Sequence, residues 1–317
     1  MAEFVTIGEP LVVFASQELD CPLSQVVDFR KFLAGAELNV AVGLVRLGHE
    51  VTYVSQVGQD SLGDFIRDEL AKTGVDTKFV SQTSEYPTGF YLKEKVSTGD
   101  PHVEYFRKNS AASHFNLKTL EMLYLSQIKI AHFSGIMAAL SENGITAVKR
   151  LLIELSTTDS LTVFDPNLRP ALWKSEKIMI ERLNELAKIA KIIMPGISEG
   201  KLLTGLSEVS DIADFYLNQS DITQTVIIKN GSKGAYVKTR TGEEFSVESY
   251  KVDKIVDTVG AGDGFAAGLI SGLLDNESLK SAVKRACAIG AFAVQSAGDN
   301  DGYPTRTVLE KFMRERE

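Results

Sequence analysis

The sequence has few of the residues that build metal centres or disulfides. Its two cysteines, Cys21 and Cys287, lie far apart and in no Cys-x-x-Cys pattern, and its four histidines are scattered along the chain. Neither a structural zinc site nor a Ser-His-Asp triad can be argued from this spacing. We therefore expect two reduced thiols, as in a cytoplasmic protein.

The sequence also has no long apolar run next to the glycine-rich stretch 257–268, where a membrane-spanning helix could otherwise be suspected. The run from Phe265 to Leu274 has about ten residues, which is too short to span a bilayer. The first eight residues contain no basic segment followed by an apolar stretch, so we expect no export signal. These absences predict a cytoplasmic protein without a membrane partner.

Basic residues are too few to balance the acidic ones. The formal net charge is -8 and the pI is near 5.2. Because nothing offsets the repulsion from phosphate, we expect no nucleic-acid partner and no binding to a membrane surface. An anionic ligand would have to be held by local groups.

Two common nucleotide-binding fingerprints are missing. No Gly-x-Gly-x-x-Gly follows the first expected strand, and no Gly-x-x-x-x-Gly-Lys-Ser/Thr occurs anywhere in the chain. Both a Rossmann dehydrogenase and a P-loop NTPase are therefore disfavoured.

A long alternation of strand and helix patterns is present instead. The chain has 317 residues, 44% of them hydrophobic, and can bury a large core. The expected strands are 4–7, 51–57, 128–133, 161–164, 191–194 and 225–229, with an edge hairpin at 235–247. The main expected helices are 34–48, 61–70, 141–155, 176–190, 264–274, 277–296 and 308–314. This order predicts an α/β fold with a doubly wound, mostly parallel sheet flanked by helices.

Two runs interrupt the alternation, at 88–95 and 102–107, and they indicate a hairpin. We expect this hairpin to belong to a small β-sheet lid formed by about 12–33 and 86–110. The sequence shows no linker, so we expect residues 1–317 to form a single domain. An ordinary surface hairpin is the alternative. Because exposed lid strands can pair with another copy, we also expect a homo-oligomer, a dimer or larger.

The stretch Asp257-Thr-Val-Gly-Ala-Gly-Asp-Gly-Phe-Ala-Ala-Gly268 combines glycines with the start of a helix. Gly260 and Gly262 are expected to make a tight turn that leads into the helix. A helix N-terminus presents unpaired N–H groups and about half a positive charge, which suits a phosphate. Asp263 lies at this point, either as a charge that favours the helix terminus or as a general base beside a phosphate site.

Polar residues follow several of the expected strands. In open α/β sheets, ligands bind at the carboxyl ends of the strands. The residues at those ends are Gly8-Glu9, Ser134-Gly135, Asp165-Pro-Asn-Leu-Arg169, Lys229-Asn-Gly-Ser-Lys-Gly234 and the stretch 257–268. Their glycines, amides, carboxylates and cations favour an enzyme.

At this point the residues show a resemblance. The stretch 257–268 resembles the C-terminal signature of the ribokinase-like (pfkB) carbohydrate kinases. Gly35-Ala-Glu-Leu-Asn-Val-Ala41, with Arg46-Leu-Gly48 and Val57-Gly-Gln-Asp-Ser-Leu-Gly63, is similar to the N-terminal signature of that family. The resemblance covers nearly the whole chain. It implies a ribokinase-like α/β sandwich with a β lid, and ATP and Mg2+ as cofactors, with a monovalent cation as a further candidate.

A finer resemblance is to the 2-keto-3-deoxygluconate kinases of this family. Its segments are Thr88–Leu92, Glu104–Ala112, His132–Ile136, Asp165–Trp173 and Gly298–Gly302. The implied reaction is ATP-dependent phosphorylation of 2-keto-3-deoxygluconate to 2-keto-3-deoxy-6-phosphogluconate. A sugar acid in an acidic protein needs dedicated donors, and Arg107, Arg169 and two tyrosines supply them. The alternatives are a pfkB kinase for a neutral sugar such as fructose or ribose, and a catalytically silent sugar-sensing module.

The resemblance implies a role for each of the site residues. Asp263 would be the general base, and the backbone at Gly260, Ala261 and Gly262 would stabilise the transferred phosphoryl group. The sugar acid would be contacted by Asp263 and by Gly35, Asn39, Tyr91, Tyr105, Arg107, Arg169 and Asp299. ATP would be held by Asn167, Lys229, Gly231, Ser232, Gly234, Gly260 and Gly262.

Each of these side chains has an ordinary structural alternative. Tyr91 and Tyr105 could be packing residues of the lid sheet, and Asp299 could lie at a helix terminus. Arg107, Arg169 and Lys229 could be surface charges.

One segment departs from the family pattern. The family has an Asn-x-x-Glu segment associated with magnesium and phosphate, and the corresponding stretch here is Gly196-Ile-Ser-Glu199. Only Glu199 can therefore be assigned to a metal contact. Magnesium would be bound mainly through ATP.

Overall fold

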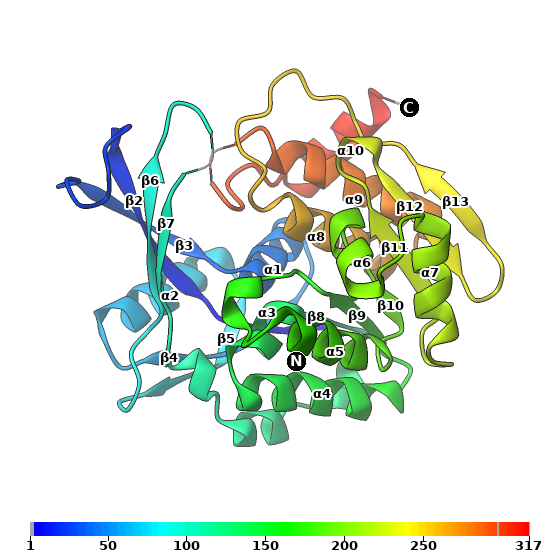
Figure 1. Ribbon diagram of the computed structural model, residues 1–317, viewed down its shortest axis with the longest axis horizontal. Helices are drawn as coiled ribbons and strands as arrows, with labels where there is room; N and C mark the ends of the chain where they lie inside the picture. Colours follow the sequence, from blue (N-terminus) through cyan, green and yellow to red (C-terminus); the bar gives the residue numbers. More distant parts are fainter. Residues whose placement is uncertain (1–2, 100, 297, 317) are drawn as a thin grey trace.

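The computed structural model describes residues 3–99, 101–296 and 298–316. Residues 1, 2, 100, 297 and 317 of the expected domain, and with residue 100 one position of the expected lid, lie outside this range. The body is a nine-stranded sheet (Figure 1). Its strands, in spatial order, are β13 (Glu244–Val247), β12 (Ala235–Thr239), β11 (Thr225–Lys229), β10 (Ile192–Ile193), β9 (Leu161–Asp165), β8 (Ile130–Ser134), β1 (Phe4–Ile7), β4 (Val51–Gly58) and β5 (Asp76–Thr83).

The sheet is parallel from β11 to β5, and β12 and β13 add an antiparallel edge hairpin. The expected doubly wound, mostly parallel sheet is therefore confirmed. Strands β1, β4 and β8 are buried along their whole length because helices cover both faces. Parallel strands have their carboxyl ends at one edge, so the polar residues that follow them are brought together.

Two layers of helices enclose the sheet. One hydrophobic core lies under α1 (Ala36–Arg46), α2 (Ser61–Thr73), α8 (Ala261–Leu274) and α9 (Leu279–Ala293). The other lies under α3 (Gly135–Leu140), α4 (Glu142–Ser156), α5 (Glu176–Ala187), α6 (Ile197–Thr204) and α7 (Val209–Asn218). Helix α4 shows why these segments are helical: Ile145, Val148, Leu152 and Leu155 repeat every three or four residues and are buried.

A second, four-stranded sheet stands beside the first, at the left of Figure 1. Its order is β3 (Phe29–Ala34), β2 (Leu11–Leu19), β6 (Phe90–Lys95) and β7 (Val103–Phe106). The expected hairpin is confirmed as the antiparallel pair β6 and β7, and β2 joins it to the N-terminal segment in parallel register. A small sheet thus lies where the lid was expected.

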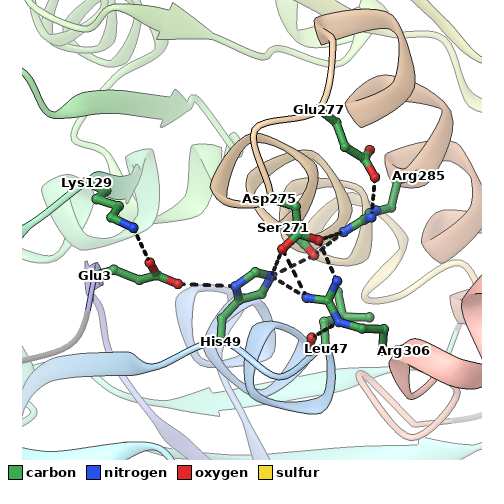
Figure 2. A network of polar contacts seen from close by, with 9 residues as sticks. All are labelled: Glu3, Leu47, His49, Lys129, Ser271, Asp275, Glu277, Arg285 and Arg306. Atoms are coloured by element: carbon green, nitrogen blue, oxygen red, sulfur yellow. Dashed lines mark hydrogen bonds and ion pairs between the residues drawn. The ribbon is translucent and has the colours of Figure 1, made fainter.

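The last helix, α10 (Arg306–Arg314), is fastened by a network of charged groups (Figure 2). Asp275, which ends α8, accepts hydrogen bonds from Arg285 and Arg306 at 2.5 Å each. His49 bonds to Ser271 at 2.9 Å within the same network. These contacts hold the C-terminal end of α8, the helix whose first turn contains Asp263.

Several elements differ from the sequence-based expectation. Strand β5 was not predicted, because only Phe79 and Val80 are buried in it and its pattern lacks clear alternation. Helix α8 begins at Ala261 rather than at residue 264. Gly262 is therefore helical, and only Gly260 makes the tight turn, with φ of 78°. The low helix propensity of glycine hid this first turn.

Candidate active site

A cavity of about 390 Å3 lies at the carboxyl ends of the main-sheet strands and extends to the second sheet. It brings together residues that are up to 290 positions apart in the sequence, from Glu9 to Asp299. The site residues expected from the sequence that line it are Gly35, Asn39, Tyr91, Tyr105, Arg107, Asn167, Arg169, Glu199, Lys229, Gly260, Gly262, Asp263 and Asp299.

Helix α8 points its N-terminus at this cavity. Gly260 precedes the helix in the left-handed conformation, and a Cβ atom there would lie 1.8 Å from the carbonyl oxygen of Asp299. At Gly262, the one atom of the described residues within 4 Å of an added Cβ is Nζ of Lys229, at 3.8 Å. The first turn of α8 therefore faces open space beside a cation. Unpaired amide N–H groups in such a place fit a phosphate group.

Replacing Gly260 with alanine is expected to inactivate the protein and to destabilise its fold. The left-handed backbone alone would cost about 1–3 kcal/mol. The total loss of stability should be larger, because the Asp299 backbone must also move. Thermal unfolding and turnover measure the two effects. Gly205→Ala is the matched control, since Gly205 has φ of 73° and an added Cβ there has no atom of the described part of the chain within 4 Å. Equal effects of the two substitutions would show that the close approach at Gly260 is unimportant.

Asp263 lies in the first turn of α8 and is half-buried. Its carboxylate accepts hydrogen bonds from the amide of Asn39 at 2.9 Å and from that of Asn167 at 3.5 Å. Burial raises the pKa of Asp263 to about 7; the bond from Asn39 opposes this rise, and the nearby Asp165 and Asp299 carboxylates add to it. A carboxylate with this pKa can accept a proton near neutral pH.

Lys229, at the end of β11, forms an ion pair with Asp165 at 2.6 Å. Burial lowers the pKa of Lys229, but the carboxylates of Asp165 and Glu199 outweigh this effect and raise it. Burial raises the pKa of Asp165 to about 6, against the attraction of Lys229. The lysine is therefore a fixed positive charge beside the N-terminus of α8.

The second sheet contributes two tyrosines, and Arg107 directly follows its strand β7. The ring of Tyr91 is buried against that of Tyr105, which is 54% exposed, with centroids 5.1 Å apart. Arg107 is buried and donates from Nε to Oε2 of Glu9 at 2.7 Å. Ser110 donates to the other oxygen of Glu9. Arg107 is thus a buried residue of the site that is already ion-paired with Glu9. It is not a surface charge.

Arg169 differs from Arg107 in its surroundings. It is exposed, and its Nη1 atom donates to the carbonyl of Leu168 at 2.8 Å. Within residues 3–99, 101–296 and 298–316 it has no ion-pair partner. Because it lines the cavity, Arg169 can offer its charge to an anionic ligand.

Glu199 lines the cavity and also caps α6. One of its oxygens accepts from the backbone N–H of Leu168 at 2.8 Å, and the other accepts from that of Gly196 at 2.6 Å. The described residues contain no group of three or more histidine, cysteine or acidic side chains that could hold a metal ion. A metal contact of Glu199 stays a prediction.

Four expected site residues do not line the cavity: Ala261, Gly231, Ser232 and Gly234. Gly231–Lys233 form a 3-10 turn after β11. A Cβ at Gly234 would lie 1.9 Å from the carbonyl oxygen of Val247. The close packing of the edge hairpin therefore explains why glycine occupies this position. An ATP contact of these residues stays a prediction.

Several cavity residues were not assigned to the site from the sequence: Glu9, Glu37, Asp165, Thr258 and Val259. Glu9 and Asp165 were both recognised as residues at strand ends. Their partners, Arg107 and Lys229, lie 98 and 64 positions away, so sequence spacing gave no sign of the two pairs. Glu37 is fully buried on α1 and accepts from Ser134.

The family model for pfkB carbohydrate kinases matches residues 1–306 of this sequence. The chain belongs to the pfkB family of carbohydrate kinases. The kinase is 46% identical over 310 residues to the 2-dehydro-3-deoxygluconokinase of Bacillus subtilis strain 168, an alignment that covers 98% of this chain and 94% of that protein. The signatures recognised in the sequence are therefore confirmed at the level of the family.

Solved structures resemble the kinase over its whole length. The PfkB protein from Polaromonas sp. JS666 has a TM-score of 0.89 and 36% identity, covering 98% of this chain and 100% of that one. The E. coli protein described as ribokinase II, in complex with ATP and Mg2+, has a TM-score of 0.89 and 27% identity, covering 99% and 100%. The ribokinase-like fold expected from the sequence is confirmed. No helix among the described residues is long and apolar enough to cross a membrane.

Proposed function

We propose that the kinase transfers a phosphoryl group from Mg-ATP to the terminal hydroxyl of 2-keto-3-deoxygluconate. The main supporting observation is a single cavity that holds three groups: Asp263 at a helix N-terminus, the half-buried Lys229 beside it, and an arginine without an ion-pair partner in the described part of the chain. The 46% identity to a 2-dehydro-3-deoxygluconokinase supports the choice of substrate.

Asp263 is the general base of this proposal. Its carboxylate takes the proton of the sugar hydroxyl as the oxygen attacks the terminal phosphorus and the bond to the ADP oxygen breaks. A positioned base contributes about 10²- to 10⁴-fold in rate. The Asn39 and Asn167 amides hold the carboxylate in one orientation.

The N-terminus of α8 and Lys229 hold the phosphates. The cavity is open at Gly262, and the amides of Gly260 and Gly262 can donate to oxygens of the transferred group. The amide of Ala261 donates to the carbonyl of Thr258 at 3.3 Å and would have to leave this bond to join them. Lys229 adds a fixed positive charge, and Mg2+ bound with ATP would neutralise the remaining phosphate charge. Asn167, held at φ of 39°, is the further ATP contact.

The sugar carboxylate is assigned to Arg169, with Tyr91 and Tyr105 from the second sheet and Arg107 directly after it. In this assignment Arg107 offers its Nη1 atom, because Glu9 contacts both Nε and Nη2. Gly35, Asn39 and Asp299 contact the hydroxyls. The second sheet acts as the lid that excludes water, and its exposed edge pairs with another copy in a homo-oligomer.

An ADP-release assay over gluconate-derived, galactonate-derived and neutral sugars tests the substrate class. We expect kcat/KM for 2-keto-3-deoxygluconate to exceed that for fructose and ribose by at least about tenfold, which corresponds to one charge-assisted hydrogen bond. A preference for fructose or ribose would favour the neutral-sugar alternative. Repeating the assay with and without K+ tests the candidate monovalent cation.

A further inference from the structure

The side-chain amide of Asn39 is hydrogen-bonded at both ends. Its Nδ2 atom donates to Oδ2 of Asp263 at 2.9 Å, and its Oδ1 atom accepts from Nδ2 of Asn300 at 2.8 Å. Asn39 is 1% exposed, so water cannot replace either partner freely. Three side chains from α1, α8 and the segment after α9 therefore form one chain of hydrogen bonds.

The direction of this chain follows from the chemistry of its last member. An ionised Asp263 carboxylate can only accept hydrogen bonds, so Asn39 must turn its NH2 group toward it. The carbonyl of the same amide then faces residue 300 and requires a donor there. Asn300 supplies that donor. Without it, the buried carbonyl of Asn39 would be left unpaired, and the orientation in which Asn39 donates to Asp263 would be less favourable.

Asn300 is itself held in place. Arg46, the last residue of α1, donates to the backbone carbonyl of Asn300 and, at 3.3 Å, to that of Tyr303. Asn39 lies in the first turns of the same helix. Asn300 does not line the active-site cavity, but it lines an adjoining cavity that shares Tyr91, Thr258 and Asp299 with it. The connection from Asn300 to Asp263 that the structure shows runs through the Asn39 amide.

We propose that Asn300 is a positioning residue, which orients the Asn39 amide so that Asn39 donates to the catalytic carboxylate of Asp263 and keeps it ionised. The inference rests on the proposed role of Asp263 as the general base. It assigns a task to a residue that neither contacts the reacting atoms nor lies near Asp263 in the sequence.

The charged and titratable groups around Asp263 set the expected pH dependence. They are Asp165 from β9, Arg169 from the loop that follows, Lys229 from β11, and Asp299 and Tyr303 from the segment after α9. Burial and the neighbouring carboxylates raise the pKa of Asp263, and the Asn39 bond is the largest opposing influence. Loss of that bond must raise the pKa further.

Asn300→Leu is nearly the same size and cannot donate. In the wild type, kcat/KM should fall on the acid side of a pKa near 7. In the variant we expect this acid limb to move up by about one pH unit, so that kcat/KM falls about tenfold at pH 6 and stays within about twofold at pH 9. The KM for ATP should not change. Asn300→Asp, which accepts rather than donates, should shift the limb at least as far.

Two comparisons separate this role from a general structural one. In an Asn39→Ala background, Asn300→Leu should cause no further shift, because the connection to Asp263 is already broken. Asn143→Leu, an exposed asparagine on α4, should leave the profile unchanged. A profile of Asn300→Leu that superimposes on the wild type, or a shift that persists in the Asn39→Ala background, would overturn the proposal.

A titration of the ligand-free protein separates this inference from the choice of substrate. Carbon-13 NMR of the carboxyl groups, with Asp263→Asn to identify the signal, measures the pKa of Asp263 without any reaction. If this pKa rises in Asn300→Leu while no sugar acid is phosphorylated, the positioning role stands and the proposed substrate fails. If the sugar acid is phosphorylated and the pKa does not move, the positioning role fails.

Discussion

Asp263→Asn is expected to lower kcat by about 10²- to 10⁴-fold while binding of the sugar acid remains measurable. Asparagine has the same shape and can still accept from Asn39, but it cannot take a proton at neutral pH. Single-turnover kinetics gives the rate of the chemical step, and calorimetric titration gives the affinity for the sugar acid. Retention of near-normal turnover would show that another group is the base.

The stability of Asp263→Asn shows whether a loss of activity could come from a damaged fold. The pKa of Asp263 is raised to about 7 in the folded protein, above the ordinary 3.8. A raised carboxyl pKa means that the ionised form is disfavoured by folding, so stability is lost as the pH rises through 7. Replacing the carboxyl with a neutral amide removes this loss. The melting temperature of Asp263→Asn at pH 8 should therefore equal or exceed that of the wild type.

Arg169→Gln should raise the KM for 2-keto-3-deoxygluconate by about 10- to 100-fold, because a charge-assisted hydrogen bond contributes about 1.5–3 kcal/mol. The KM for a neutral sugar should change by less than about twofold, since it offers Arg169 no charge. Steady-state kinetics with both substrates measures the difference. Equal losses for the acid and the neutral sugar would contradict the assignment of Arg169 to the carboxylate.

Arg169 is a cleaner test than Arg107. Removal of Arg107 would leave Glu9 buried at 2% exposure without its ion-pair partner, and breaking such a pair destabilises a protein by about 3–5 kcal/mol. An effect on the KM could then reflect a disturbed fold. Arg182→Gln, an exposed arginine on α5 away from the cavity, provides the matched control for loss of a positive charge.

Local sequence patterns predicted much of this fold, because the burial of a strand or of one helix face is visible in the spacing of its apolar residues. The burial of β1, β8 and β9 appears in the sequence as short apolar runs, and α4 appears as a repeat of three and four residues. The polar residues at the strand ends then gathered at one edge of the sheet, as parallel order requires. The main errors, β5 and the first turn of α8, involve segments whose residues favour their observed structure only weakly.

The pairing of side chains within the site was beyond local patterns. Glu9 contacts Arg107 across 98 positions, and Asn39 contacts Asn300 across 261. Each contact depends on how two separate elements pack, and a single sequence carries no periodicity for such a distance. This matters for function. From the sequence, Arg107 was expected to donate to the sugar acid, whereas in the structure the carboxylate of Glu9 neutralises its positive charge.

Identification of the product tests the central claim most directly. The purified kinase is incubated with Mg-ATP and 2-keto-3-deoxygluconate, and the product is examined by phosphorus–proton correlation NMR. We predict a phosphomonoester coupled to the two protons on C6, formed in equal amount to ADP. ADP release without a new phosphomonoester, or phosphate on another oxygen, would contradict the proposed reaction.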